Sequence, residues 1–237
     1  MKKINDGFNL NAGKRIMKKK KCIIFGLTIF TQMLRHLEEE FYDVEIVAYT
    51  VDRKYKQEDV FDGLPVVAFE DLVQNYPNSE YSVLIGLGYS HMNNIRKQKF
   101  EEVKSKGYKI ESFVHPQVIR DNTFEMGEGN IILEGAILGY KVKIGNGNII
   151  WNGCNISHES IIEDFSYFSP GSTLGGKTIV KNNCFLGMNS VVRGSRVISE
   201  YTLIGAGCYV NNGTKPYGVY VPARSVCLEN KKSTDMM

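Results

Sequence analysis

The chain has 237 residues, of which 43% are hydrophobic and 23% charged, which is ordinary for a globular protein of one large or two small domains. Its net charge of +3 is too small to favour a nucleic acid or a membrane surface as the partner. No apolar run approaches the roughly 18 to 20 residues that a membrane span needs, so none is expected.

Residues 1–19 are predicted to form a flexible, solvated leader. Basic residues gather there, at Lys14, Arg15 and from Lys18 to Lys21, but no secretory apolar segment follows them. Met17 is an alternative natural start. The segment is therefore interpreted as a solvated tail. The protein is expected to be cytoplasmic, because its cysteines, described below, fit a reduced and structural role.

Residues 20–112 alternate between strand and helix patterns. This alternation predicts a small parallel sheet covered by helices on both faces, a Rossmann-like α/β domain. In the first helix, Ile29, Met33, Leu34 and Leu37 are predicted to share the apolar side. The strands are expected at 21–26, 44–51, 66–68 and 82–86, and the helices at 28–40, 70–75 and 93–106.

Candidate ligand-binding residues follow these strands, where parallel sheets hold ligands. Gly26 ends the first strand, Asp52 the second, and Gly86 to Tyr89 follow a later one, so this edge is predicted to bind an acceptor molecule. The dinucleotide fingerprint has three glycines where this chain has only Gly26, which disfavours NAD or FAD. The sequence does not decide whether Gly26 only permits the turn or also contacts a nucleotide.

A second pattern begins at Met126: every sixth residue is large and apolar for fifteen consecutive repeats. Six extended residues span about 20 Å, so three repeats make one 18-residue triangular coil, and fifteen make about five coils of a solenoid. The pattern alone does not give the handedness of the coil. The repeated residues are Met126, Ile132, Leu138, Ile144, Ile150, Ile156, Ile162, Phe168, Leu174, Val180, Leu186, Val192, Ile198, Ile204 and Val210. The solenoid is predicted to span residues 113–228, with a tail at 229–237.

The cysteines fit this repeat. Cys154, Cys184 and Cys208 occupy the small-residue position four after an apolar one, and no pair has CxxC spacing. They are predicted to be reduced, packed corner residues.

The solenoid contains one histidine, His158, followed by Glu159. A lone histidine is more often structural than catalytic, but three features favour chemistry here. The position is predicted to be exposed near a corner, Glu159 is placed to support a positive ring, and Gly176 stands one 18-residue coil further on. A glycine stacked beside the histidine offers an open backbone N–H, which predicts an oxyanion donor.

Several segments together resemble the sugar O-acyltransferases related to sialic-acid O-acetyltransferases and the bacterial nucleotide-amino-sugar N-acetyltransferases. The likeness covers residues 20–228 and is most specific in the His-Glu and Gly-Gly segments. The segments are 157–166, 169–171, 174–176, 183–190 and 221–224.

The resemblance implies a left-handed parallel β-helix, a homotrimer, and acetyl-CoA bound between adjacent solenoids. It implies that His158 is the general base, Glu159 its electrostatic partner, and the Gly176 amide the holder of the thioester oxygen. The residues that it implies for acetyl-CoA binding are Gly187, Gly205, Ala206, Ala223 and Arg224.

The acceptor implied is a nucleotide-linked amino sugar of bacterial surface glycan synthesis, acylated on its amine. Tyr167 stands nine residues after His158, where the amino-sugar enzymes have a second histidine, and is expected to donate a hydrogen bond near the substrate. O-acetylation of a sugar hydroxyl remains the alternative, because an alcohol must also lose a proton.

Two rival classes are also weighed. A zinc hydratase of the γ-carbonic anhydrase kind needs about three histidine ligands, whereas the solenoid has only His158, so no metal is expected. A non-catalytic scaffold is the more serious rival, because a repeat specifies a fold and no reaction. The one-coil register of His158 and Gly176 argues against the scaffold.

Overall fold

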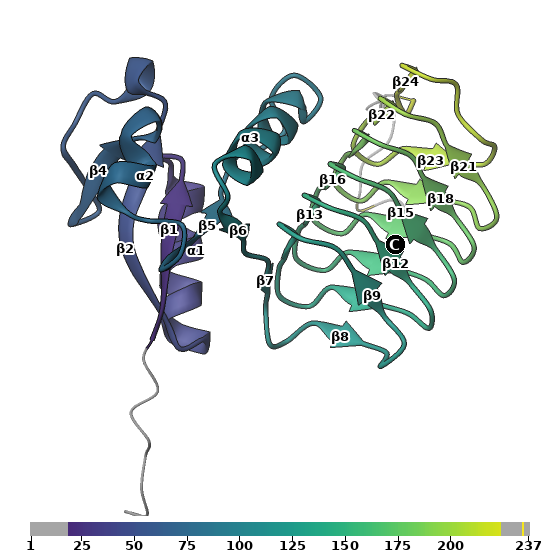
Figure 1. The fold of residues 1–237 in the computed structure, drawn as a ribbon. Helices are drawn as coiled ribbons and strands as arrows, with labels where there is room; N and C mark the ends of the chain where they lie inside the picture. The colour runs from purple at the N-terminus through teal and green to yellow at the C-terminus, as the bar shows by residue number, and fades with distance from the viewer. Residues whose placement is uncertain (1–18, 224–233, 235–237) are drawn as a thin grey trace, which may run out of the picture.

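The structure, a computed structural model, describes residues 19–223 and residue 234. Figure 1 shows an α/β domain standing beside a solenoid, as the sequence predicts. The expected leader and tail, and Arg224 with them, lie outside the described residues apart from Lys19 and Thr234.

The α/β domain is built on a six-stranded sheet of order β3-β4-β2-β1-β5-β6, parallel except for the β3–β4 pair. The chain runs outward from β1 to β2 and β4 on one side, and to β5 and β6 on the other. The strand order therefore reverses between β1 and β5, and open parallel sheets hold ligands at the carboxyl ends of the strands beside such a reversal. The strands are β1 (Lys20–Phe25), β2 (Val44–Val51), β3 (Val60–Phe61), β4 (Leu64–Ala68), β5 (Tyr81–Ile85) and β6 (Lys109–Ile110).

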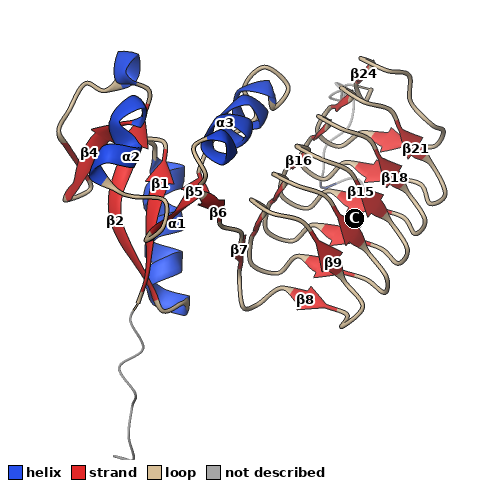
Figure 2. Cartoon of the chain, viewed as in Figure 1, coloured by secondary structure: helices blue, strands red, loops and turns tan. Residues whose placement is uncertain are grey.

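Helices cover both faces of the sheet, because alternate strand residues point to opposite sides. Ile24 packs with Leu34 of α1 (Ile29–Phe41), whereas Ile23 and Phe25 pack with α2 (Leu72–Asn75) and α3 (Asn94–Ser105). Two short 3₁₀ helices, η1 (Arg53–Tyr55) and η2 (Phe69–Asp71), complete the domain (Figure 2).

Helix α1 begins where its sequence predicts. The Thr28 side chain accepts a hydrogen bond from the Thr31 N–H, and the Thr31 hydroxyl accepts one from the Thr28 N–H, which forms a capping box. The prediction that Ile29 shares the buried side is wrong, since Ile29 is 81% exposed. As the first helical residue it stands at the sheet edge, with no strand to pack against.

The solenoid consists of two-residue strands that pair in parallel with the strand 18 residues away; Ile131, for example, pairs with Ile149. They form three sheets, because every third strand along the chain joins the same sheet. The first sheet runs from β7 to β22 and ends with β24, the second runs from β8 to β23, and the third from β9 to β21. Within the described residues, β7 to β21 make five complete three-strand coils.

The first sheet contains β7 (Phe113–Val114), β10 (Ile131–Ile132), β13 (Ile149–Ile150), β16 (Tyr167–Phe168), β19 (Phe185–Leu186), β22 (Leu203–Ile204) and β24 (Val219–Tyr220). The second contains β8 (Ile119–Arg120), β11 (Ile137–Leu138), β14 (Asn155–Ile156), β17 (Thr173–Leu174), β20 (Val191–Val192) and β23 (Tyr209–Val210). The third contains β9 (Glu125–Met126), β12 (Lys143–Ile144), β15 (Ile161–Ile162), β18 (Ile179–Val180) and β21 (Val197–Ile198).

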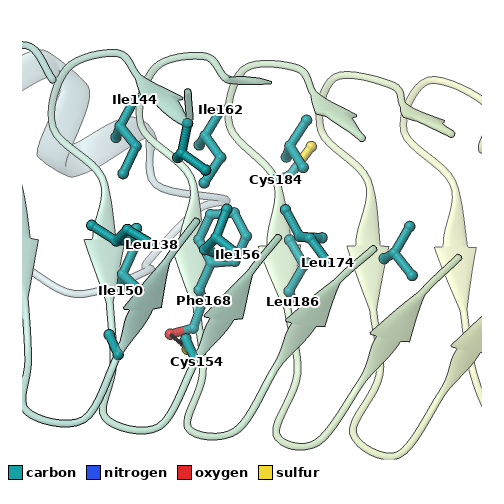
Figure 3. Close-up of a cluster of buried hydrophobic side chains, with 14 of the residues drawn as sticks. Leu138, Ile144, Ile150, Cys154, Ile156, Ile162, Phe168, Leu174, Cys184 and Leu186 are labelled. Carbon is teal, nitrogen blue, oxygen red and sulfur yellow. Dashed lines mark hydrogen bonds between the residues drawn. The ribbon is translucent and has the colours of Figure 1, made fainter. Parts of the chain in front are cut away.

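From β10 to β23 the second residue of each strand points into the coil, and these residues form the apolar ladder that the repeat predicts (Figure 3). From Ile132 to Val210 each of them is at most 5% exposed, which contributes about 1.5 to 3 kcal/mol per side chain. Met126 is the exception at 37% exposure, because it lies in the first coil, which has no complete coil below it. The predicted corner cysteines Cys154, Cys184 and Cys208 are free and buried.

The outer face of the first sheet packs against the α/β domain. Ile131, Ile149 and Tyr167 share one apolar cluster with Ile24 and Leu34 of the α/β domain. Among the described residues, no helix is long and apolar enough to span a membrane.

Candidate functional site

His158 lies at the corner between β14 and β15, with its side chain 58% exposed. Its Nδ1 is 3.1 Å from Oε2 of Glu159, and Nζ of Lys177 is 3.8 Å from the same oxygen. The hydrogen bond from His158, followed by the charges of Lys177 and Lys141, lowers the pKa of Glu159. Glu159 is therefore an ionised partner for Nδ1, which leaves Nε2 free as a base.

Gly176 stands directly beside this ring, one coil along. The Lys177 N–H donates to the His158 carbonyl at 2.9 Å, which holds the two corners in register. A Cβ on Gly176 would lie 2.5 Å from Nε2 of His158, so only glycine leaves room for the imidazole. Within the described part of the chain, the Gly176 N–H has no hydrogen-bond acceptor. A free base and a free N–H donor thus meet at one corner.

The residues predicted to hold acetyl-CoA lie at a different corner, between β19 and β20. A Cβ on Gly187 would lie 2.5 Å from the Ala206 nitrogen, so the two coils approach closely there. Ala206 is exposed, Gly205 is partly exposed, and the Ala206 N–H donates to no acceptor within residues 19–223. Ala223 is exposed near the end of the described chain. In one chain the sheet containing β14, β17 and β20 separates Gly187 from His158.

At the sheet edge, Gly26 and Gly86 lie side by side at the ends of β1 and β5. The Gly86 N–H donates to the Phe25 carbonyl at 3.0 Å, and a Cβ on Gly86 would lie 2.3 Å from the Thr31 methyl of α1. Gly26 has a φ of +121°, which other residues rarely adopt. Gly26 is thus required by the backbone, and both glycines bring the strand ends close to the N-terminus of α1.

A cavity of about 230 Å³ opens at this edge, and its walls include Gly26, Thr28, Asp52, Tyr55 and Leu87. A wider cavity of about 730 Å³ adjoins it, since Asp52 and Lys99 line both. The predicted acceptor edge therefore contains a concave site. Of the predicted acceptor residues, Gly26 and Asp52 line it, whereas Gly86 and Tyr89 are not among its wall residues.

Lys99 was not predicted, because a lysine in an amphipathic helix is expected on the solvated face. Its side chain is only 10% exposed, and its Nζ lies 2.6 Å from Asp52 Oδ1 and 2.6 Å from Glu102 Oε2. The two ion pairs raise the pKa of Lys99 against the opposing effect of burial, which is the largest single influence. Lys99 thus neutralises the carboxylate that the sequence singled out.

Tyr89 and Tyr167 meet, with ring centroids 5.0 Å apart, and Tyr167 stacks on Phe185 at 5.4 Å. Tyr89 is 55% exposed, whereas Tyr167 is 8% exposed and burial raises its pKa to about 12. The role of Tyr167 as a hydrogen-bond donor near the substrate stays a prediction, and within one chain its side chain does not lie at the His158 corner. Nine residues are half of an 18-residue coil, so Tyr167 points to the α/β domain, away from His158.

The site residues thus fall into separate groups in one chain. The acceptor cavity lies in the α/β domain, which packs on the sheet of β7 to β24, and the His158 corner joins the other two sheets. Within residues 19–223 and residue 234, no group of three or more His, Cys, Asp or Glu is placed to hold a metal ion.

The combination of an N-terminal α/β domain with a parallel β-helix of 18-residue coils is a fold of acetyltransferases of known structure. The acetyltransferase domain of PglB from Neisseria gonorrhoeae matches with a TM-score of 0.77 and 19% identity, over 86% of this chain and 97% of that domain. The same domain in complex with acetyl coenzyme A matches with a TM-score of 0.72 and 19% identity, over 81% of this chain and 93% of that one.

PerB from Caulobacter crescentus, in complex with CoA and GDP-perosamine, matches with a TM-score of 0.75 and 19% identity, over 85% of this chain and 94% of that one. No protein-family model matches this sequence, and no curated protein matches it. At these identities the likeness establishes the fold, which these acetyltransferases share with this chain.

Proposed function

We propose that this protein is an acetyl-CoA-dependent N-acetyltransferase that acts on the amine of a nucleotide-linked amino sugar. The observation that carries the proposal is the His158 corner, where an imidazole partnered by Glu159 lies against the Cα of Gly176. A scaffold has no need of a glycine that clears space for an exposed histidine. The fold neighbours, whose structures hold acetyl coenzyme A or CoA with GDP-perosamine, support the same reaction class.

The chemistry follows from the geometry of the corner. The amine nitrogen of the acceptor attacks the thioester carbon while Nε2 of His158 takes one proton from that nitrogen. The Gly176 N–H stabilises the negative charge that develops on the thioester oxygen. Collapse of the tetrahedral intermediate breaks the C–S bond, and the departing CoA sulfur receives the proton from His158.

Glu159 serves this cycle through Nδ1. By accepting a hydrogen bond from the Nδ1–H group it holds the tautomer with a free Nε2, and its negative charge stabilises the imidazolium that forms. Lys177 and Lys141 keep the carboxylate ionised.

The proposed assembly is a homotrimer of left-handed β-helices, with acetyl-CoA between adjacent solenoids. The proposal is supported by the separation of the candidate site residues within one chain. Gly187 and His158 lie at different corners of the solenoid, and the acceptor cavity lies in the α/β domain. A neighbouring copy brings such surfaces together. A cleft between two subunits also buries a pantetheine arm more completely than one exposed edge.

The α/β domain, as a Rossmann-like domain, is the proposed acceptor-binding part. Gly26 and Asp52 line its cavity, Gly86 lies beside Gly26, and Tyr89 follows the wall residue Leu87 and packs against Tyr167. Gly187, Gly205, Ala206, Ala223 and Arg224 are the proposed acetyl-CoA residues, and no metal takes part. Because acetyl-CoA and nucleotide-linked sugars are cytoplasmic metabolites, the cytoplasm is the proposed location.

The proposal is tested with a panel of nucleotide-linked amino sugars and free sialic acids, each incubated with acetyl-CoA while thiol release is followed. Turnover of an amino sugar with an N-acetyl product is the expected result. Turnover of a sialic acid alone would move the assignment to O-acetylation. No turnover of any acceptor, with no binding of CoA by calorimetry, would favour the scaffold.

A further inference from the structure

Among the described residues, Arg96 of α3 is the largest side chain that is less than 2% exposed, and its hydrogen bonds join the two domains. Its guanidinium donates to carbonyls on the solenoid, Gly147 at 2.8 Å and Ser166 at 3.3 Å. It also donates to carbonyls of the α/β domain, Leu87 at 3.3 Å and Gly88 at 2.5 Å. One side chain therefore bonds to the backbone of both parts.

The chemistry of these contacts is unusual for a buried cation. The fifth contact is to the Asn93 side-chain oxygen at 3.1 Å, so every acceptor that Arg96 bonds to within residues 19–223 is neutral. Burial lowers the pKa of Arg96 to about 9, and no carboxylate offsets that cost. A buried arginine without a counter-ion is explained by its geometry, because its planar guanidinium carries five N–H donors that can bond to several backbone carbonyls at once.

The backbone that Arg96 holds is the wall of the acceptor cavity. Leu87 lines the cavity, and its carbonyl, like that of Gly88, is one of the acceptors of Arg96. Immediately after this wall the chain carries Tyr89, whose ring packs on Tyr167 of the solenoid. The cavity wall and the solenoid are thus connected through one buried group.

The turn between Tyr89 and α3 is strained and is held from the solenoid as well. His91, Met92 and Asn93 have φ values of 51°, 51° and 66°, three consecutive left-handed residues without a glycine. The Asn93 amide donates to the Cys184 carbonyl at 3.1 Å, and the Asn183 amide donates to the Met92 carbonyl at 2.9 Å. Such a conformation persists because the coils fix it.

From these contacts we infer that Arg96 is a positioning residue, which fixes the acceptor cavity relative to the solenoid so that a bound acceptor is presented correctly to the base. This inference rests on the proposed function. In that function the acceptor sits on one domain and His158 on a solenoid corner, so the reaction depends on how the two domains are oriented. A misplacement of about 1 Å can cost roughly 100-fold in rate.

The test compares Arg96→Lys and Arg96→Gln with the wild type. Lysine keeps the charge but has three donors in place of five, and glutamine keeps two donors without the charge. The matched control is Lys104→Gln: Lys104 also connects α3 to the solenoid, through Glu128 at 2.8 Å, but the two side chains are 48% and 52% exposed. An exposed pair of this kind contributes little.

With the amino sugar that the wild type turns over, kcat of both Arg96 variants is expected to fall roughly 10- to 100-fold. The KM for that acceptor and the calorimetric Kd for CoA should stay within about threefold, and Lys104→Gln should stay within about twofold in all three quantities. Loss of acceptor affinity at unchanged kcat would overturn the inference, because Arg96 would then only support the cavity wall. An unchanged kcat in a folded Arg96→Lys would overturn it as well.

Hydrogen exchange supplies a readout that needs no turnover. Amides of residues 86–94 should exchange faster in the Arg96 variants, while those of the inner ladder, such as Phe168, keep their protection. If Arg96→Gln does not fold, Arg96→Lys carries the comparison. Faster exchange at 86–94 in a protein that acetylates nothing would contradict the proposed function, but it would still support the role of Arg96 in fixing this segment. Unchanged exchange at 86–94 would contradict that role of Arg96.

Discussion

Replacing Gly176 by alanine places a single methyl group against the proposed base. The added Cβ would lie 2.5 Å from Nε2, 2.6 Å from Cε1 and 3.0 Å from Cδ2 of His158. Ordinary contacts between such atoms are about 3.5 Å or longer, so the ring must move by about 1 Å. That displacement takes Nε2 away from the acceptor nitrogen.

The substitution should spare the fold. The φ of Gly176 lies outside the left-handed region, so alanine meets no backbone strain there. His158 is 58% exposed and has room to swing outward. We expect Tm to change by only a few degrees while kcat falls roughly 100-fold, the usual consequence of a 1 Å misplacement.

Thiol release from acetyl-CoA in the presence of the acceptor measures the effect, and a double-mutant cycle identifies its cause. If alanine acts by displacing the ring, His158→Ala together with Gly176→Ala should be no slower than His158→Ala alone. Additive losses would show that Gly176 acts independently of His158, and a Gly176→Ala enzyme with normal kcat would refute the steric reasoning.

Four further outcomes are expected. Glu159→Gln should lower kcat by less than His158→Ala does, because Nε2 remains available as a base; an equal loss in steady-state assays would contradict this. Light scattering should give the mass of a trimer, and a fully active monomer would exclude the shared site. Removal of the residues before His115 should abolish acceptor use in the thiol assay, unless the solenoid alone selects among sugars. Burial raises the pKa of Glu38 from 4.5 to about 7, so the folded state keeps a proton that the unfolded chain loses and stability falls as pH rises between these values. Glu38→Gln should therefore stabilise the protein by roughly 1 to 3 kcal/mol at pH 8 and by almost nothing at pH 4, as measured by urea unfolding at the two pH values.

The solenoid was largely predictable because its repeat is a direct consequence of coil geometry. Each sixth residue points inward whatever its neighbours do, so the ladder from Ile132 to Val210 is buried as expected. The predicted burial of Met126 was wrong, because Met126 lies at the end of the stack, where one side of the coil has no neighbouring coil. The sequence repeat does not show where the stack ends. The same register correctly placed His158 beside Gly176.

Contacts between the two domains were not predictable from local patterns. Arg96 and Lys99 lie in a helix whose polar positions are normally solvated, yet both are buried because the solenoid and the sheet edge cover them. Tyr167 was assigned to the substrate by resemblance alone, and the repeat did not predict that its ring would pack against Tyr89 of the α/β domain. Long-range packing, rather than periodicity, decides the position of such residues.

The central claim is that His158 takes the proton of the acceptor amine, and the rate of His158→Ala against pH tests it most directly. The account predicts that kcat falls roughly 10²- to 10⁴-fold, that the rise in rate between acidic and neutral pH disappears, and that the Kd for CoA is nearly unchanged. Near-normal turnover of the true acceptor by His158→Ala, with the pH dependence retained, would contradict the account and leave a different base or a scaffold as the better description.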